Sequence, residues 1–322
     1  MSVQTSLMTY DDALELFLAT RGTYGGGLSN HGPMATEALD QMGAAEWIGP
    51  FVTDYLPRLD PRTRPPSDDD DDWHDLLARF LPDRVVAAAA EAGHELLRVA
   101  HDVRGLERAE AGGHVPNVRV DELRTALMRW KPSRALPAPS ALIGDRSVAE
   151  WSAALAPLAT FDRRPGLLTV NLAAAARQPG FVDIVATLQP AERPQDTLDR
   201  LAMRALEGYL ANEEYLSRFT MLHGVTVSTM ARVLVDHLDA AGQRRLEGAV
   251  AGFVAAAAVA YDRRVDTSDA PLPPIQPSLA HRAGATLDDH TIKFTNACLG
   301  LAERTGSELP LHAAELQIRL TS

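Results

Sequence analysis

Apolar residues recur at intervals of three and four along nearly the whole chain, and this helical spacing constrains the fold more than any other feature. No segment shows a convincing alternation of apolar and polar residues, which is the pattern of a half-buried strand. We also find no internal repeat of fixed period. The sequence therefore predicts an all-α fold, a single multi-helix domain over residues 1–322 with about a dozen helices.

Capping residues, prolines and glycines set the limits of the predicted helices. His94 falls inside a long helix, 83–111, whereas His223 falls in a His-Gly junction before the helix 225–240. The apolar stretch 249–261 is too short to span a membrane, so we expect a buried core helix there. The predicted ranges are 11–20, 33–42, 46–59, 83–111, 120–130, 147–158, 171–177, 181–188, 197–214, 225–240, 241–262, 288–304 and 311–319.

Two proline-rich stretches, 61–72 and 266–277, are expected to be loops. The first contains five consecutive aspartates, which we interpret as a solvated surface run. These adjacent carboxylates lack the spacing and the glycine of a calcium loop, so no calcium site is expected there.

The charge and the cysteine count restrict the partners and the compartment. The net charge is −12 and the pI is near 5.3, so we expect neither nucleic acid nor an anionic membrane as a partner. The N-terminal segment lacks the pattern of a signal peptide, and the single cysteine, Cys298, excludes an intrachain disulfide and a thiolate metal cluster. The expectation is a soluble, cytoplasmic protein that is a monomer or a homodimer.

Several common catalytic motifs are missing from the chain. There is no P-loop, no GxGxxG, no GxSxG and no HExxH. A nucleotide-binding or serine-hydrolase function therefore has no support in the sequence. Ten histidines remain, and with one cysteine available a transition-metal site here needs histidines, carboxylates or a less usual ligand.

Lysine is scarce, since only Lys131 and Lys293 supply it among the 31 basic residues. A coding bias toward arginine explains the scarcity, and a lysine that persists against it points to a position where arginine is no substitute. His290 and Lys293 are three residues apart in DDHTIKFTNAC, so they share a helix face. Burial there would lower the pKa of the lysine and free its amine to attack carbon dioxide, which yields an anionic carbamate ligand. A lysine that extends along the surface beside an exposed histidine explains the spacing equally well.

Four further histidines stand in contexts that suit a metal ligand or a packing residue. His94 and His101 are seven residues apart in GHELLRVAHDVR, so they share a helix face. His31 in LSNHGPMATEAL and His223 in FTMLHGVTVS each precede a glycine at a predicted helix start. Both roles stay open for all four from the residues alone. The remaining histidines are interpreted as surface or packing residues: His74, His114, His237, His281 and His312.

Four segments together resemble the questin oxidase-like family. They are SNHGPMATEALDQMGA, GHELLRVAHDVRGLE, LHGVTVSTMARVL and DDHTIKFTNACL. Trp73 and the stretch 123–130 are also similar, and the resemblance runs from about residue 10 to about residue 305, nearly the whole chain. Each segment is weak alone, and their order makes the resemblance specific.

The resemblance implies an all-helical oxidoreductase with a non-haem Fe(2+) centre held by four histidines and a carboxylated lysine. Family members act on anthraquinones and related polyketides, by Baeyer–Villiger-like oxygenation or by oxidative ring cleavage, and some were described as using NADPH. His290 and Lys293 are then the catalytic pair. At the matching positions the implied metal ligands are His31, His94, His223, His290 and Lys293.

The chain also departs from the family. The stretch 73–94 is shorter, Asn296 stands where an acidic residue is common, and the whole chain is smaller than the fungal members. His101 stands where fungal relatives have an aromatic residue, so we expect it beside the centre and not in it. None of these departures falls on an implied ligand, so they bear on the substrate pocket and not on the metal centre.

The expected function is an iron-dependent mono- or dioxygenase that uses O2 on an aromatic or quinone substrate of secondary metabolism. Arg98 and Tyr24 are candidates for positioning a phenolate. A metal-free monooxygenase that uses NADPH is the first alternative, and the missing dinucleotide motif counts against it. The second alternative is a non-enzymatic helical binding or scaffold protein in which the histidines only pack.

Overall fold

The computed structural model describes residues 7–25, 28–62, 72–160, 162–164, 168–263 and 272–322. Over these residues the predicted all-α fold is confirmed, because the only strands are β1 (Thr23–Tyr24) and β2 (Leu28–Ser29), which pair antiparallel. Within the described part of the chain, no helix has both the length and the apolar character needed to cross a membrane. The α-helices are α1 (Tyr10–Leu18), α2 (Gly32–Gln41), α3 (Ile48–Tyr55), α4 (Trp73–Arg84), α5 (His94–Ala111), α6 (Asn117–Arg129), α7 (Val148–Leu155), α8 (Leu168–Ala176), α9 (Phe181–Ala186), α10 (Pro194–Ala211), α11 (Tyr215–Val235), α12 (Ala240–Tyr261), α13 (Leu279–Ala285), α14 (Asp289–Thr305) and α15 (Leu309–Thr321).

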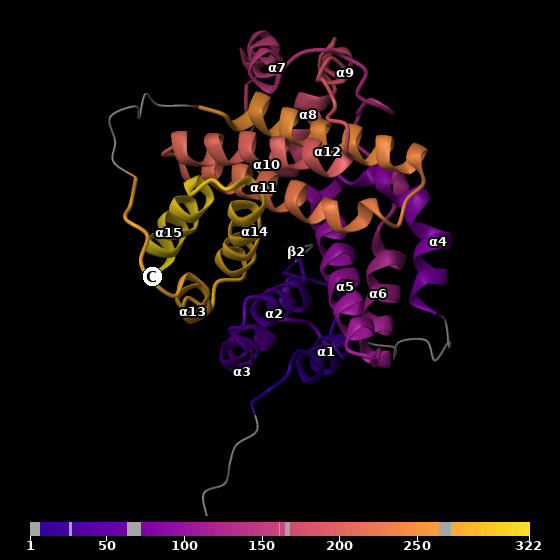
Figure 1. The fold of residues 1–322 in the computed structure, drawn as a ribbon, viewed down its shortest axis with the longest axis vertical. Helices are drawn as coiled ribbons and strands as arrows, with labels where there is room; N and C mark the ends of the chain where they lie inside the picture. Colours follow the sequence, from indigo (N-terminus) through magenta and orange to yellow (C-terminus); the bar gives the residue numbers. More distant parts are fainter. Residues whose placement is uncertain (1–6, 26–27, 63–71, 161, 165–167, 264–271) are drawn as a thin grey trace, which may run out of the picture.

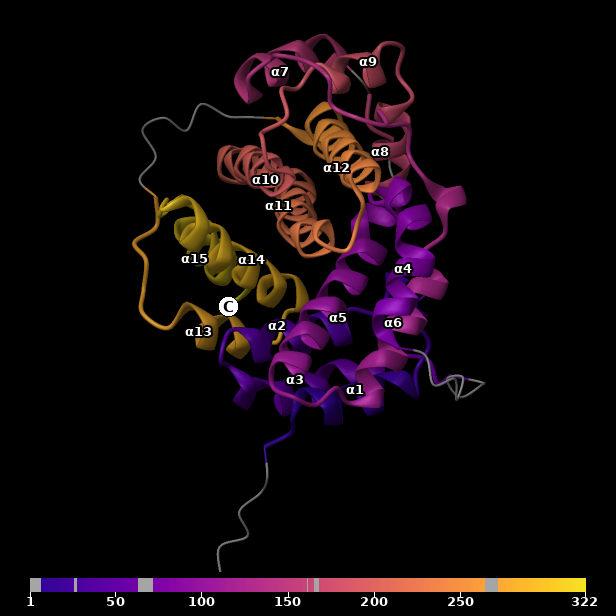
Figure 2. The ribbon, with the colours of Figure 1, turned by 45° about the vertical axis from the view of Figure 1, so that its right-hand side comes forward.

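α11 is the central helix, since it packs against α5, α10, α12 and α14. Figures 1 and 2 show α10, α11 and α12 side by side in the upper part of the molecule, with α14 and α15 on one side below them and α5 and α6 on the other. Four helices that are distant in the sequence close a ring: α2 packs on α5, α5 on α11, α11 on α14, and α14 on α2. This ring joins the segments that carry the candidate ligands.

The prediction of one continuous helix over 83–111 is wrong. α4 ends at Arg84, two short 3-10 turns follow, and α5 begins at His94. Glu91, Ala92 and Gly93 have φ angles of 50°, 60° and 80°, so three consecutive residues lie in the left-handed region. A right-handed helix cannot continue through them. The break therefore places His94 in the first turn of α5 and not in a helix interior.

Gly93 is needed at this break, because its φ is 80° and a Cβ there would lie 2.2 Å from Cγ2 of Val227 on α11. Gly93→Ala adds left-handed strain and a clash with a packed helix, so we expect the free energy of unfolding to fall by about 2–4 kcal/mol in urea denaturation. Gly113→Ala is the matched control, since its φ is 83° but a Cβ there meets nothing within 4 Å. It should lose only about 1 kcal/mol. Equal losses in the two variants would contradict the packing argument.

The prediction of a helix start after His223 is also wrong. His223 lies in the interior of α11, which begins at Tyr215. Gly224 is an interior helix residue, and a Cβ there would lie 2.8 Å from Cβ of Ala205 on α10. The glycine therefore permits the close approach of two helices and does not mark a turn.

The remaining predictions have mixed outcomes. Residues 249–261 are buried in α12, as predicted. The seven-residue helix α13 was not predicted. The aspartate run 68–72 lies outside the described residues except for Asp72, whose side chain caps α4 by accepting from the backbone N–H of His74. Residues 266–271 of the second proline-rich stretch also lie outside the described part of the chain.

Candidate metal centre

The ring of α2, α5, α11 and α14 brings four histidine side chains together. His31, directly before α2, stacks on His94 with ring centroids 4.7 Å apart. The ring of His290 lies 4.8 Å from that of His31. The ring of His223 lies 5.2 Å from those of both His94 and His290. The four histidines that the resemblance implies as ligands are thus neighbours in space, although they come from both halves of the chain.

Backbone carbonyl groups set the tautomer of two of these imidazoles. Nδ1 of His223 lies 2.7 Å from the carbonyl oxygen of Phe219, one turn earlier in α11. Nδ1 of His94 contacts the carbonyl oxygen of Glu91 in the same way. A carbonyl oxygen only accepts, so both Nδ1 atoms carry the proton and both Nε2 atoms keep a lone pair. Burial lowers the pKa of both imidazoles well below the usual value, so they are neutral at pH 7.

Asp289 orients the other two imidazoles, and the sequence reasoning missed it. Its Oδ1 lies 2.6 Å from Nδ1 of His31 and 2.7 Å from Nδ1 of His290. Burial alone would raise the pKa of this carboxyl group, but the imidazoles of His290 and His31 hold the pKa well below its usual range. The carboxylate therefore accepts from both Nδ1–H groups and leaves both Nε2 lone pairs free. The signal in the sequence was an acidic residue directly beside a candidate ligand, in DDH.

Lys293 lies beside Asp289 in the same cluster, and only 3% of its surface is exposed. Its Nζ lies 3.7 Å from Oδ1 of Asp289, which is beyond hydrogen-bond distance. Burial lowers the pKa of the amine, an effect that Asp289 partly offsets. The lysine charge in turn helps to lower the pKa of His31, the first of the four imidazoles. The alternative of a lysine that extends along the surface is wrong.

The cluster has the donor atoms that a metal ion needs. One ring nitrogen from each of His31, His94 and His290 lies within 4.8 Å of the other two. The Nε2 atoms of His94 and His290 are buried and have no hydrogen-bond partner among the described residues. Buried polar atoms are normally paired, so these two nitrogens fit a ligand that the polypeptide itself does not supply. His223 stands outside this closest group of three and contributes the adjacent ring.

His101 and Arg98 belong to neighbouring networks. Nδ1 of His101 lies 2.6 Å from Oε2 of Glu37, a fully buried carboxylate that also accepts from Arg104. Nε of Arg98 lies 2.5 Å from Oε1 of Glu122 on α6. Because its charge is already paired inside the protein, Arg98 is not available to position a phenolate, contrary to the expectation from the sequence.

The other residues considered from the sequence lie farther from the centre. Tyr24 approaches it only through Tyr55: the two rings are 6.1 Å apart, and the hydroxyl of Tyr55 accepts from the backbone N–H of His31 at 2.8 Å. His114 is exposed, and the remaining histidines bind groups outside the cluster: His74, His237, His281 and His312.

Neutral buried histidines make the stability of the metal-free protein depend on pH. Burial lowers the pKa of His31 and of His101 to about 4, whereas an unfolded histidine has a pKa of about 6.5. Between these values the unfolded chain binds more protons, so the free energy of unfolding must fall as the pH falls. Each such histidine removes up to about 3 kcal/mol by pH 4. Urea denaturation of chelator-treated protein measures this, and a constant value from pH 7 to pH 5 would refute it.

A cavity of about 210 Å³ adjoins His290. The stacked rings of Tyr215 and Phe219 line it, and the ring of Phe219 lies 4.8 Å from that of His290. Arg218 also lines this cavity, and its buried Nε has no hydrogen-bond partner among the described residues. The cavity therefore offers flat aromatic walls and a cationic donor beside the candidate centre.

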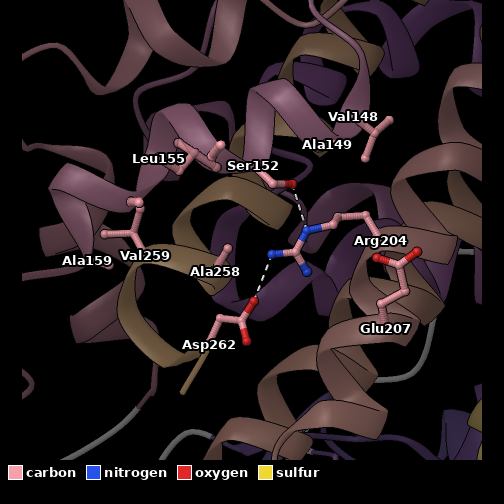
Figure 3. Close-up of a pocket in the computed structure, with 12 residues that line it drawn as sticks. Val148, Ala149, Ser152, Leu155, Ala159, Arg204, Glu207, Ala258, Val259 and Asp262 are labelled. Carbon is pink, nitrogen blue, oxygen red and sulfur yellow. Dashed lines mark hydrogen bonds and ion pairs between the residues drawn. The ribbon is translucent and has the colours of Figure 1, made fainter. Parts of the chain in front are cut away.

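A separate cavity of about 670 Å³ lies between α7, α10 and α12 (Figure 3). Small apolar side chains form most of its lining. Arg204 spans the wall, with Nε 2.7 Å from Oγ of Ser152 and Nη2 2.7 Å from Oδ2 of Asp262. No histidine or cysteine lines this cavity, and the guanidinium of Arg204 forms an ion pair with Asp262. The candidate centre is therefore placed at the histidines and not here.

Comparison with models of protein families, with curated proteins and with solved structures found no match to this chain. The function is therefore argued from the chemistry of the histidine cluster and from the residues around it.

Proposed function

We propose that this chain is an iron-dependent oxygenase whose metal ligands are His31, His94, His223, His290 and a carboxylated Lys293. One observation carries the proposal: four neighbouring imidazoles all use Nδ1 as a donor, so all four keep an Nε2 lone pair in one buried cluster. A cluster of imidazoles oriented through Nδ1 by a carboxylate and by carbonyl groups is the usual environment of a histidine-bound metal.

Carboxylation of Lys293 removes an unfavourable charge. An ammonium group beside four imidazoles repels any cation that they hold. In the proposed step the neutral amine attacks carbon dioxide, an N–C bond forms, and one proton leaves. A cation is thereby replaced by a carbamate, whose oxygen is an anionic ligand. Burial, which lowers the pKa of Lys293, favours the neutral amine that the step requires.

The proposed donor set favours iron(II). Imidazole suits iron, zinc and copper, and iron(II) also accepts an anionic oxygen beside histidines. Five protein ligands also exceed the four of a tetrahedral structural zinc site. Iron(II) bound here would supply the activation of dioxygen toward an electron-rich ring. The helices of the chain orient the ligands, and their buried side chains exclude water from the reacting groups.

An aromatic or quinone substrate of the polyketide type suits the cavity beside His290. At about 210 Å³ the cavity is smaller than the roughly 300–1,000 Å³ of a site that encloses a drug-sized ligand, so it admits the reacting ring and not a large extended molecule. Phe219 and Tyr215 offer stacking surfaces, and Arg218 offers a donor for a phenolic or quinone oxygen. The resemblance to the questin oxidase-like family supports the same substrate class, with Baeyer–Villiger-like oxygenation or ring cleavage as the reaction.

The metal content of protein purified without a histidine tag tests the proposal. We expect iron near one atom per chain by mass spectrometry of the metals. Oxygen consumption with a phenolic anthraquinone should stop on chelation and return with iron(II) but not with zinc. Protein that oxidises NADPH after chelation would contradict the proposal and favour the metal-free monooxygenase. Protein that binds no iron when iron(II) is supplied and consumes no oxygen would also contradict it and favour the non-enzymatic alternative.

A further inference from the structure

A cavity of about 540 Å³ on the face of α6 concentrates positive charge. It lies between the segment 20–23, Arg62 and the second half of α6. The chain as a whole has a net charge of −12, whereas the charged residues that line this cavity are mostly arginines. Its charged residues are Arg21, Arg62, Arg124, Arg129 and Asp121.

Two of the four guanidinium groups are held in place by carboxylates. Nη1 of Arg124 lies 2.5 Å from Oδ1 of Asp121, one turn earlier in α6. Nη2 of Arg129 lies 3.2 Å from Oε1 of Glu95 at the start of α5. These ion pairs orient the two side chains, which form one wall of the cavity.

The side chain of Arg129 is tightly packed in the cavity wall. A Cβ at Gly22 would lie 2.8 Å from Cδ, Nε and Nη1 of Arg129, so the guanidinium stem packs directly on the backbone of the segment 20–23. Nε of Arg129 is buried and has no hydrogen-bond partner among the described residues. Glycine at position 22 is thus what lets the arginine reach this place.

The guanidinium groups of Arg21 and Arg62 are available to bind a ligand. The side chains of Arg21 and Arg62 form no ion pair or hydrogen bond with any residue in the described ranges, and only their backbone groups are bonded. Two guanidinium groups that are unpaired among the described residues, beside two paired ones, give the cavity a positive potential.

We propose that this cavity binds the phosphate groups of a small metabolite. Guanidinium groups bind phosphate through paired, charge-assisted hydrogen bonds, and Arg21 and Arg62 offer two such forks. The volume exceeds that of a phosphate group, so the rest of the ligand packs against Met128 and the threonines of the lining. A cavity of this volume in an acidic chain suits a small molecule and not a nucleic acid strand.

This inference is independent of the metal centre. None of the lining residues of the arginine cavity lines the cavity at His290 or is a proposed ligand. Loss of phosphate binding and loss of metal binding are therefore separate results.

Calorimetric titration of the whole chain with inorganic pyrophosphate tests the proposal. We expect saturable binding of one pyrophosphate per chain, and weaker binding as the salt concentration rises. The double variant Arg21→Gln/Arg62→Gln should bind at least about tenfold more weakly, because two charge-assisted contacts are lost. Its melting temperature should stay unchanged, since neither side chain has a partner in the described part of the chain. ADP that binds more tightly than pyrophosphate would assign the ligand to nucleotides, and equal affinities would assign it to the phosphates alone.

The matched control is Arg177→Gln/Arg193→Gln, which removes the same charge from exposed positions outside the cavity. Equal weakening in the two double variants would show a general charge effect and overturn the proposal. So would the absence of pyrophosphate binding to the natural chain.

Discussion

Lys293→Arg is expected to abolish iron binding, with occupancy falling from about one atom per chain to near zero. Arginine keeps the positive charge, cannot lose its proton and forms no carbamate, so it leaves a cation among the imidazoles. Only 3% of Lys293 is exposed, so the charge cannot turn away into solvent. Metal analysis measures the occupancy. Carbon-13 NMR with labelled bicarbonate should show a carbamate signal in the natural chain and none in the variant.

Lys131→Arg is the matched control, because it changes the chain's other lysine at an exposed position. It should keep full iron occupancy and the carbamate signal. Since arginine is larger than lysine in a buried site, Lys293→Met provides a second variant of similar volume with no charge. Both Lys293 variants should lack iron while their helical circular dichroism is preserved. Full iron occupancy in a folded Lys293 variant would refute the carbamate.

Asp289→Asn is expected to weaken iron affinity by about 10–100-fold. The carboxylate accepts from Nδ1 of both His31 and His290, which leaves Nε2 as the free lone pair on each ring. An asparagine amide group can donate to Nδ1, which stabilises the tautomer whose proton sits on Nε2. Competition with a chelator of known affinity measures the change.

Asp288→Asn is the control for this change, since it removes the same charge one residue away. Oδ1 of Asp288 caps α14 by accepting from the backbone N–H of Thr291 at 2.7 Å, and asparagine caps helices equally well. Its iron affinity should stay within about twofold of the natural chain. If the two variants lose affinity to the same extent, the effect is one of charge and not of ring orientation.

From the residues alone, His290 and Lys293 were the candidates with the clearest local signal, and the full ligand set was what the resemblance implied. His290 and Lys293 share a helix face by their spacing alone, and the scarcity of lysine marked Lys293. Asp289 was missed because only one of its two imidazole partners, His290, is its neighbour along the chain. Its other partner, His31, comes from the opposite end of the chain, and periodicity carries no information about such contacts.

Arg98 is the opposite case, a residue that was expected in the site and lies outside it. It was a candidate for positioning a phenolate, yet its partner Glu122 lies on another helix and pairs its charge. The arginine that does line the cavity at His290 is Arg218, and the sequence around it has no distinctive motif. Which arginine is paired and which is available depends on helix packing, so no rule of spacing separates them.

By itself, the sequence determined the all-α class, because apolar spacing along a helix is a local property that burial then reinforces. Only the tertiary structure decided where His94 and His223 stand. The sequence predicted a continuous helix through the three residues before His94 and a break at the glycine after His223, and the structure shows the reverse. One ends a helix and the other continues it, because Gly93 meets Val227 at a turn, whereas Gly224 lets α10 and α11 pack closely. Contacts between distant segments make that difference, and the same contacts close the ring of α2, α5, α11 and α14 around the histidines.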